Sequence, residues 1–368
     1  MRCDDIVVLG LSLSSSWGNG HATTWRALIR GLAELGQKVL FLERDQPWYA
    51  ANRDLPVPDF CELGLYGSRA ELYSRYGSRI AEARAVLCGS YLPEGIAVID
   101  DILALVRGPC GFYDIDTPVT VAALARKDCD YLAARQIRAF DFYLSFTGGP
   151  MLGLLSDRYE ARRPVAFHCA VDAERYQPVA VPPRWDLGYL GTFSADRQPA
   201  LERLLLEPAR RLPQCRFVVA GPQYPDDIAW PANVTRIAHV APAEHPAFYA
   251  AQRFTLNITR ADMIAAGWSP SVRLFEAAAC ATPIISDDWP GLTDLLPAPT
   301  AILIAEDSDA VTHILRHVSD TARRRMAAEA RSIVLKAHTG QARARVLLRL
   351  LDALASASVP LMPVSSVR

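Results

Sequence analysis

The segment at residues 267–286 has the residue types of a site for a phosphate and a ribose. Ser269 is a good helix N-cap and Pro270 suits the first helical position, so we predict a helix that begins here. The free N–H groups and positive dipole end of a helix bind phosphate. Arg273 and Glu276 are three residues apart and share a helix face. A cation would then lie near the phosphate, with a carboxylate one turn deeper to accept from two ribose hydroxyls. The alternative is an ordinary cap with an ion pair.

Two further polar stretches are expected to reach the same site from the ends of predicted strands. Gly191 and Thr192 form a turn after one strand, where backbone amides can approach a diphosphate. Arg197 is the candidate counter-charge for that diphosphate, although a solvated loop arginine is the alternative interpretation. Asn257 and Arg260 end another strand shortly before the predicted helix, so their polar groups should face the same cleft.

His21 is a candidate proton acceptor at the start of the first predicted helix. It follows a loop that contains Gly18, Asn19 and Gly20, which we expect to face the acceptor and the transferred sugar. A helix N-terminus disfavours a protonated imidazole, so a neutral His21 can accept a proton. An equally weighted alternative is that His21 only caps its helix.

Asp114 and Asp116 are the other candidate bases. Alternate residues of a strand share one face, so the two carboxylates could instead hold a divalent cation. Two carboxylates at this spacing also occur by chance, and Asp116 with Thr117 and Pro118 has the residue types of a helix start. We therefore expect no metal site here.

The same N-terminal loop partly imitates a dinucleotide-binding fingerprint. Gly18 and Gly20 follow a strand, and Glu43 ends the next strand, where an acid can hold a ribose. Thr23 replaces the third glycine, and the loop that begins after Gly10 is too long for the tight turn of that motif. An oxidoreductase that uses NAD is therefore an alternative with weak support.

Short β-rich runs alternate with stretches of helical period, which predicts an α/β fold with largely parallel sheets. Helices are expected between most of the strands, so we predict two Rossmann-like domains with a boundary near residues 172–185. The predicted domains are residues 1–175 and 176–340, followed by a helix and tail at 341–368. The predicted strands are 5–10, 38–43, 85–89, 111–114, 142–146, 165–168, 187–190, 217–220, 234–239, 254–258, 283–286 and 301–304.

Composition excludes several classes of protein and partner. Hydrophobic residues make up 51% and charged residues 21%, which is typical of a globular protein and not of a disordered or coiled-coil chain. The 39 Lys and Arg are balanced by 40 Asp and Glu, so there is no basic field for nucleic acid. The eight cysteines are scattered without a CxxC pair, and no apolar run reaches membrane-spanning length. We expect a soluble, cytoplasmic protein without an integral membrane segment.

The 267–286 segment resembles the donor-nucleotide motif of GT-B glycosyltransferases, specifically the CgeB-like group with a glycosyltransferase family 1/4-like C-terminal domain. In that motif a cap, an arginine and a Phe-Glu run with Ala, Cys and Gly precede a strand; Ala281 stands here where the pattern usually has Gly. Residues 186–197, 256–260, 338–339 and 114–118 are likewise similar to this family.

The resemblance implies a GT-B fold whose two sheets face each other across a cleft. It implies a metal-independent hexosyltransferase that needs no cofactor and moves a sugar from a nucleoside-diphosphate sugar, such as a UDP or dTDP sugar, to an unidentified glycan, protein or small molecule. The acceptor would meet the N-terminal domain. The donor-binding residues would be Gly191, Thr192, Arg197, Asn257, Arg260, Ser269, Ser271, Arg273 and Glu276. A protein that binds the nucleotide sugar without turnover is a further alternative.

Overall fold

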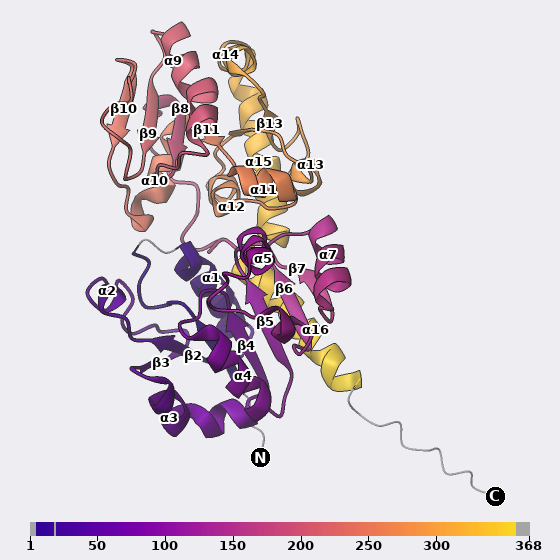
Figure 1. Ribbon diagram of the computed structural model, residues 1–368. Helices are drawn as coiled ribbons and strands as arrows, with labels where there is room; N and C mark the ends of the chain where they lie inside the picture. Colours follow the sequence, from indigo (N-terminus) through magenta and orange to yellow (C-terminus); the bar gives the residue numbers. More distant parts are fainter. Residues whose placement is uncertain (1–4, 18–19, 358–368) are drawn as a thin grey trace, which may run out of the picture.

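Two parallel β-sheets, one in each half of the chain, organise the computed structural model, which describes residues 5–17 and 20–357 (Figure 1). Within these residues the first sheet has seven strands in the order β3-β2-β1-β4-β5-β6-β7, and the second has six in the order β10-β9-β8-β11-β12-β13. All the pairings are parallel. The predicted α/β class with two Rossmann-like domains is confirmed.

The N-terminal sheet contains one strand that the sequence analysis missed, β3. It is an edge strand that begins at the exposed Glu62, alternates between partly buried and buried residues and has Gly64 at its centre, so it lacks the continuous apolar run that identified the others. The strands of this sheet are β1 (Ile6–Gly10), β2 (Val39–Arg44), β3 (Glu62–Tyr66), β4 (Ala85–Gly89), β5 (Cys110–Asp114), β6 (Phe142–Ser145) and β7 (Pro164–Ala166).

Helices cover both faces of the N-terminal sheet. Leu72 of α3 and Ile99 of α4 are buried on one face, whereas Trp25 of α1 packs on the other. The helices of this half are α1 (Gly20–Glu34), α2 (Pro47–Ala50), α3 (Arg69–Glu82), α4 (Gly95–Leu105), α5 (Thr117–Arg126), α6 (Ala134–Ile137) and α7 (Pro150–Tyr159).

The C-terminal sheet is built in the same way. Its strands are β8 (Trp185–Leu190), β9 (Phe217–Ala220), β10 (Val234–Ile237), β11 (Gln252–Asn257), β12 (Ile284–Ser286) and β13 (Leu303–Ile304). Its helices are α8 (Gln198–Leu201), a π-helical turn η1 (Glu202–Leu206), α9 (Glu207–Arg211), a 3-10 turn η2 (Pro242–Glu244), α10 (His245–Ala250), α11 (Ala261–Ala266), α12 (Val272–Ala279), α13 (Leu292–Leu295), α14 (Ser308–His317) and α15 (Asp320–Ala337).

The chain crosses between the domains twice, and the two crossings lie side by side. Val171, after β7, donates its N–H to the His338 carbonyl at 3.0 Å, and Gly340 donates to the Val171 carbonyl at 3.1 Å. The last helix, α16 (Gly340–Ala357), then runs back along the N-terminal domain beside α1 (Figure 1). The segment after residue 340 therefore completes the N-terminal core, with Leu347 and Leu351 buried against it.

The crossing of α1 and α16 leaves no room for side chains at two glycines. A Cβ atom on Gly31 would lie 2.3 Å from the carbonyl carbon of Gly340, and one on Gly340 would lie 1.9 Å from the Ala27 oxygen. Both neighbours are backbone atoms, which cannot swing aside as a flexible side chain can. The close approach of the two helices therefore depends on glycine at both positions.

We expect Gly31→Ala to lower the free energy of unfolding by about 1–3 kcal/mol through overpacking. Gly153 in α7 is the matched control, because a Cβ atom there meets nothing within 4 Å. Gly153→Ala should be neutral or stabilising by up to about 1 kcal/mol. Urea denaturation of the two variants tests this. Equal, small effects would contradict the close crossing.

Candidate active site

The helix that carries Arg273 and Glu276 begins two residues later than predicted. α12 follows Ser271, whereas the Ser269 hydroxyl donates to the Gly267 carbonyl at 2.9 Å and lies 2.7 Å from the Thr147 hydroxyl of the N-terminal domain. Gly267 and Trp268 both have positive φ, so the chain turns sharply there instead of starting the helix. The prediction of Ser269 as the N-cap is wrong, and the residue instead joins the two domains.

Arg273, Ser271 and Asn257 come together at the carboxyl ends of β8 and β11. The Arg273 guanidinium donates to the Leu190 carbonyl and to Asn257 Oδ1, and the Ser271 hydroxyl donates to the same Oδ1 at 2.8 Å. The guanidinium also lies 5.0 Å from the centre of the Tyr189 ring. Among the described residues Arg273 makes no ion pair with Glu276. The alternative interpretation as a surface ion pair is therefore wrong.

Arg197 adds a second cation to this end of the sheet. Its Nη2 donates to the Thr192 carbonyl at 2.9 Å, and its Nε is buried without a hydrogen-bond partner in the described part of the chain. Burial lowers the pKa of Arg197, and the positive charges of Arg273 and Arg260 lower it further. A bound anion would offset both effects, because it would pair with the partly buried guanidinium and reduce its repulsion by Arg273 and Arg260.

Gly191 and Arg260 lie at the edges of this cluster of cations. A Cβ atom on Gly191 would come within 2.9 Å of Arg273 Nη2, so the glycine lets the guanidinium approach the backbone of the loop. Arg260 is about half exposed, and its Nε lies 3.7 Å from a carboxylate oxygen of Asp196. The cluster therefore has a partly buried side, Arg197 and Arg273, and a more exposed side, Arg260.

Glu276 is buried beneath this cluster, with only 5% of its surface exposed. Its Oε2 accepts a hydrogen bond from the Tyr249 hydroxyl at 3.1 Å. His245 Nδ1 is 3.9 Å from the same oxygen. The carboxylate thus lies inside the domain, and the phenol and the imidazole beside it were not predicted.

His21 and Asp116 form a pair in the N-terminal domain. His21 Nε2 lies 3.1 Å from Asp116 Oδ2, and Asp116 keeps 32% of its side-chain surface exposed. The pair joins the start of α1 to the start of α5, which follow β1 and β5. The Tyr91 ring packs edge-on against the imidazole at 5.2 Å. Such a carboxylate can orient the imidazole and stabilise its protonated form.

Asp114 does not join this pair. It is fully buried, and its carboxylate accepts hydrogen bonds from the Tyr143 and Thr120 hydroxyls at 2.7 and 2.6 Å. Burial raises the pKa of Asp114 to about 6. We therefore drop Asp114 from the candidate bases. The two carboxylates therefore have different surroundings, since Asp114 faces hydroxyls of the core and Asp116 faces His21.

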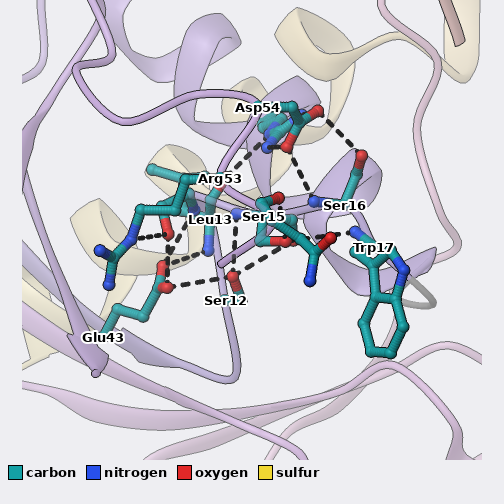
Figure 2. A network of polar contacts seen from close by, with 11 residues as sticks. Ser12, Leu13, Ser15, Ser16, Trp17, Glu43, Arg53 and Asp54 are labelled. Carbon is teal, nitrogen blue, oxygen red and sulfur yellow. Dashed lines mark hydrogen bonds and ion pairs between the residues drawn. The ribbon is translucent and has the colours of Figure 1, made fainter. Parts of the chain in front are cut away.

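Glu43 is committed to the loop before α1 (Figure 2). Its carboxylate accepts hydrogen bonds from the Ser12 hydroxyl, the Leu13 N–H, and both the N–H and the hydroxyl of Ser14, at 2.6–3.1 Å. The side chain is fully buried, so it cannot receive a ribose. The alternative of an oxidoreductase that uses NAD is therefore not supported, because Glu43 was its proposed ribose-binding residue.

The loop at residues 12–17 is fixed on its other side by Asp54 (Figure 2). This carboxylate accepts two hydrogen bonds from Arg26, both at 2.8 Å, and two from the N–H and hydroxyl of Ser16. The loop leading to His21 is thus held as far as Trp17. Gly18 and Asn19 lie outside the described residues, and Gly20 is the first residue of α1.

Several residues of the site carried no signal in the sequence. Tyr249, His245 and Tyr176 surround Glu276 but belong to α10 and to the crossing between the domains. Thr147, which meets Ser269, lies in the segment between β6 and α7 of the N-terminal domain. No pattern of spacing links these residues to Glu276, so only the folded chain reveals them.

A family model described as "Glycosyl transferase-like" matches residues 197–349. A comparison with curated proteins gave no match. Among solved structures, the sucrose-phosphate synthase of Thermosynechococcus elongatus is similar, with a TM-score of 0.69, 16% identity, and coverage of 97% of this chain and 100% of that one. The described helices include none that is long and apolar enough to cross a bilayer.

Two more similar structures hold nucleotides. Anabaena HepE in complex with UDP and glucose has a TM-score of 0.66 and 12% identity over 95% of this chain and 100% of that one. An alpha-glucosyltransferase in complex with UDP-glucose and DNA containing an abasic site has a TM-score of 0.68 and 11% identity, over 95% and 99%. The chain therefore has the GT-B fold, and residues 197–349 of its C-terminal half match a glycosyl transferase-like domain.

Proposed function

We propose that the protein moves a hexose from a nucleoside-diphosphate sugar to a hydroxyl group of an acceptor. The observation that carries the proposal is the cluster of Arg197 and Arg273 above the buried Glu276, all within the matched domain. Cations and a carboxylate at this spacing suit a diphosphate and a ribose. UDP is the first nucleotide to test, because similar structures hold it.

The donor cations favour departure of the nucleotide. As the bond between the sugar C1 and the diphosphate oxygen breaks, negative charge grows on that oxygen, and Arg197 and Arg273 stabilise it. The acceptor oxygen forms the new bond to C1. His21 takes the proton of the acceptor hydroxyl, and Asp116 stabilises the imidazolium that results.

A metal-independent mechanism predicts that EDTA leaves nucleotide binding intact. The proposed ligands of the diphosphate are arginines and backbone N–H groups, which replace the charge that Mg²⁺ would supply. UDP at about 100 times its dissociation constant should add about 2.7 kcal/mol to the free energy of unfolding, with or without EDTA. A thermal-shift series measures this. Loss of the UDP effect in EDTA, restored by Mn²⁺, would contradict metal independence.

We also propose the family subgroup of the protein, its cellular location and the kind of acceptor that it does not use. Membership of the CgeB-like group rests on the motif around Arg273 and Glu276. A cytoplasmic location is supported by the seven cysteines of the described chain, all of which are free thiols. The formal net charge of −1 disfavours DNA as the acceptor.

Turnover of UDP-glucose into a glycosylated product or free glucose would distinguish an enzyme from a protein that only binds nucleotide sugars.

A further inference from the structure

Glu276 is a buried carboxylate with few partners. Its Oε2 accepts a hydrogen bond from Tyr249 at 3.1 Å, and the Tyr176 hydroxyl also faces the carboxylate, whose charge adds to burial in raising the pKa of that phenol. A carboxylate has acceptor positions for about four hydrogen bonds, and leaving them empty in the interior is costly. No arginine or lysine in the described chain forms an ion pair with it. Such a group is arranged to receive donors from outside the protein, and the two adjacent hydroxyls of a ribose supply two.

His245 does not supply the missing hydrogen bond in its neutral form. Its Nε2 lies 3.2 Å from the Val240 carbonyl, which can only accept, so Nε2 carries the hydrogen. Its Nδ1 is then an acceptor, and the Tyr176 hydroxyl, 3.1 Å away, donates to it. The hydrogen of Tyr176 is thereby committed to His245. This leaves Tyr249 as the partner whose hydrogen is directed at Glu276.

Tyr249 is itself placed to orient the carboxylate and not to touch a ligand. The residue is wholly buried at the end of α10, whereas Glu276 lies on α12. Burial raises the pKa of the Tyr249 phenol, and the charge of Glu276 raises it further, so the hydroxyl stays a donor at neutral pH. Its hydrogen bond fixes Oε2 on the side of the core.

We propose that Tyr249 is a positioning residue that turns the Glu276 carboxylate toward the ribose hydroxyls of the donor nucleotide. The inference rests on the proposed function and adds to it a residue and a specificity. By holding one oxygen, Tyr249 directs the remaining acceptor positions to the 2′ and 3′ hydroxyls. The site thereby distinguishes ribonucleotides from 2′-deoxyribonucleotides.

The test is Tyr249→Phe, titrated with UDP and 2′-deoxy-UDP and, in parallel, with GDP and 2′-deoxy-GDP. The variant loses one hydroxyl and keeps the ring. We expect the affinity for the preferred ribonucleotide to fall about tenfold, which corresponds to one hydrogen bond to a charged group. The affinity for its 2′-deoxy counterpart should change much less, so the preference for ribose should shrink.

Tyr143→Phe is the matched control, because Tyr143 also donates to a buried carboxylate, Asp114, but in the N-terminal domain. It should lower the melting temperature and leave both affinities unchanged. A Tyr249→Phe protein that keeps the wild-type preference for ribose, whether its affinities are equal to wild type or uniformly lower, would overturn the inference alone. A wild-type protein that binds neither ribonucleotide would overturn the proposed donor site as well.

Discussion

Replacing His21 with alanine is expected to lower kcat by about 10²–10⁴, the usual contribution of a general base. The reason is that the imidazole, held by Asp116 at 3.1 Å, is the proton acceptor that we propose for the acceptor hydroxyl. The affinity for UDP should stay within about twofold, since the donor ligands lie in the other domain. Steady-state kinetics with a donor sugar and calorimetric titration of UDP measure the two effects.

Asp116→Asn should also lower kcat, because the amide cannot stabilise an imidazolium as a carboxylate does. Because the two side chains act as one unit, the double variant should be little slower than His21→Ala alone. His313→Ala, an exposed histidine of α14, is the control and should behave as wild type. A His21→Ala protein with the wild-type kcat would exclude His21 as the base. Additive losses would show that the two side chains act separately.

The sequence predicted most of the strands well, because a buried strand depends on a local pattern of residues. A buried strand such as residues 85–89 is recognised by its apolar run. The three-residue spacing of Arg273 and Glu276 predicts that both lie on one helix, as they do on α12. The predicted start of α12 was wrong because contacts with residues distant in the sequence decide where this helix begins. Ser269 has the residue type of a cap, but its hydroxyl is used by Gly267 and by Thr147, which lies 122 residues away.

The environments of the carboxylates could not be predicted for the same reason. Asp114 and Asp116 look alike in the sequence, but Tyr143 holds the first in the core and His21 meets the second at the surface. Glu43 ends a strand in the sequence as a ribose-binding acid would, but its oxygens accept hydrogen bonds from the loop at residues 12–14. In each case the deciding partner comes from another element, and no local pattern specifies it.

Glu276→Gln is expected to weaken UDP binding by about ten- to a hundredfold. The carboxylate would accept hydrogen bonds from the ribose, and a hydrogen bond to a charged group contributes about 1.5–3 kcal/mol. The substitution is nearly isosteric, and the Tyr249 hydroxyl can still donate to the amide oxygen. The melting temperature should therefore change little. Glu329→Gln, on the exposed face of α15, is the control and should leave UDP binding unchanged.

Calorimetric titration of UDP into the wild-type and Glu276→Gln proteins tests the proposed donor site in the C-terminal domain most directly. The predicted result is saturable one-to-one binding by the wild type and a dissociation constant about ten- to a hundredfold higher for the variant, with both proteins folded. Equal dissociation constants would contradict the placement of the ribose at Glu276, which is buried beside Tyr249 and His245. A wild-type protein that does not bind UDP at all would contradict UDP as the donor nucleotide.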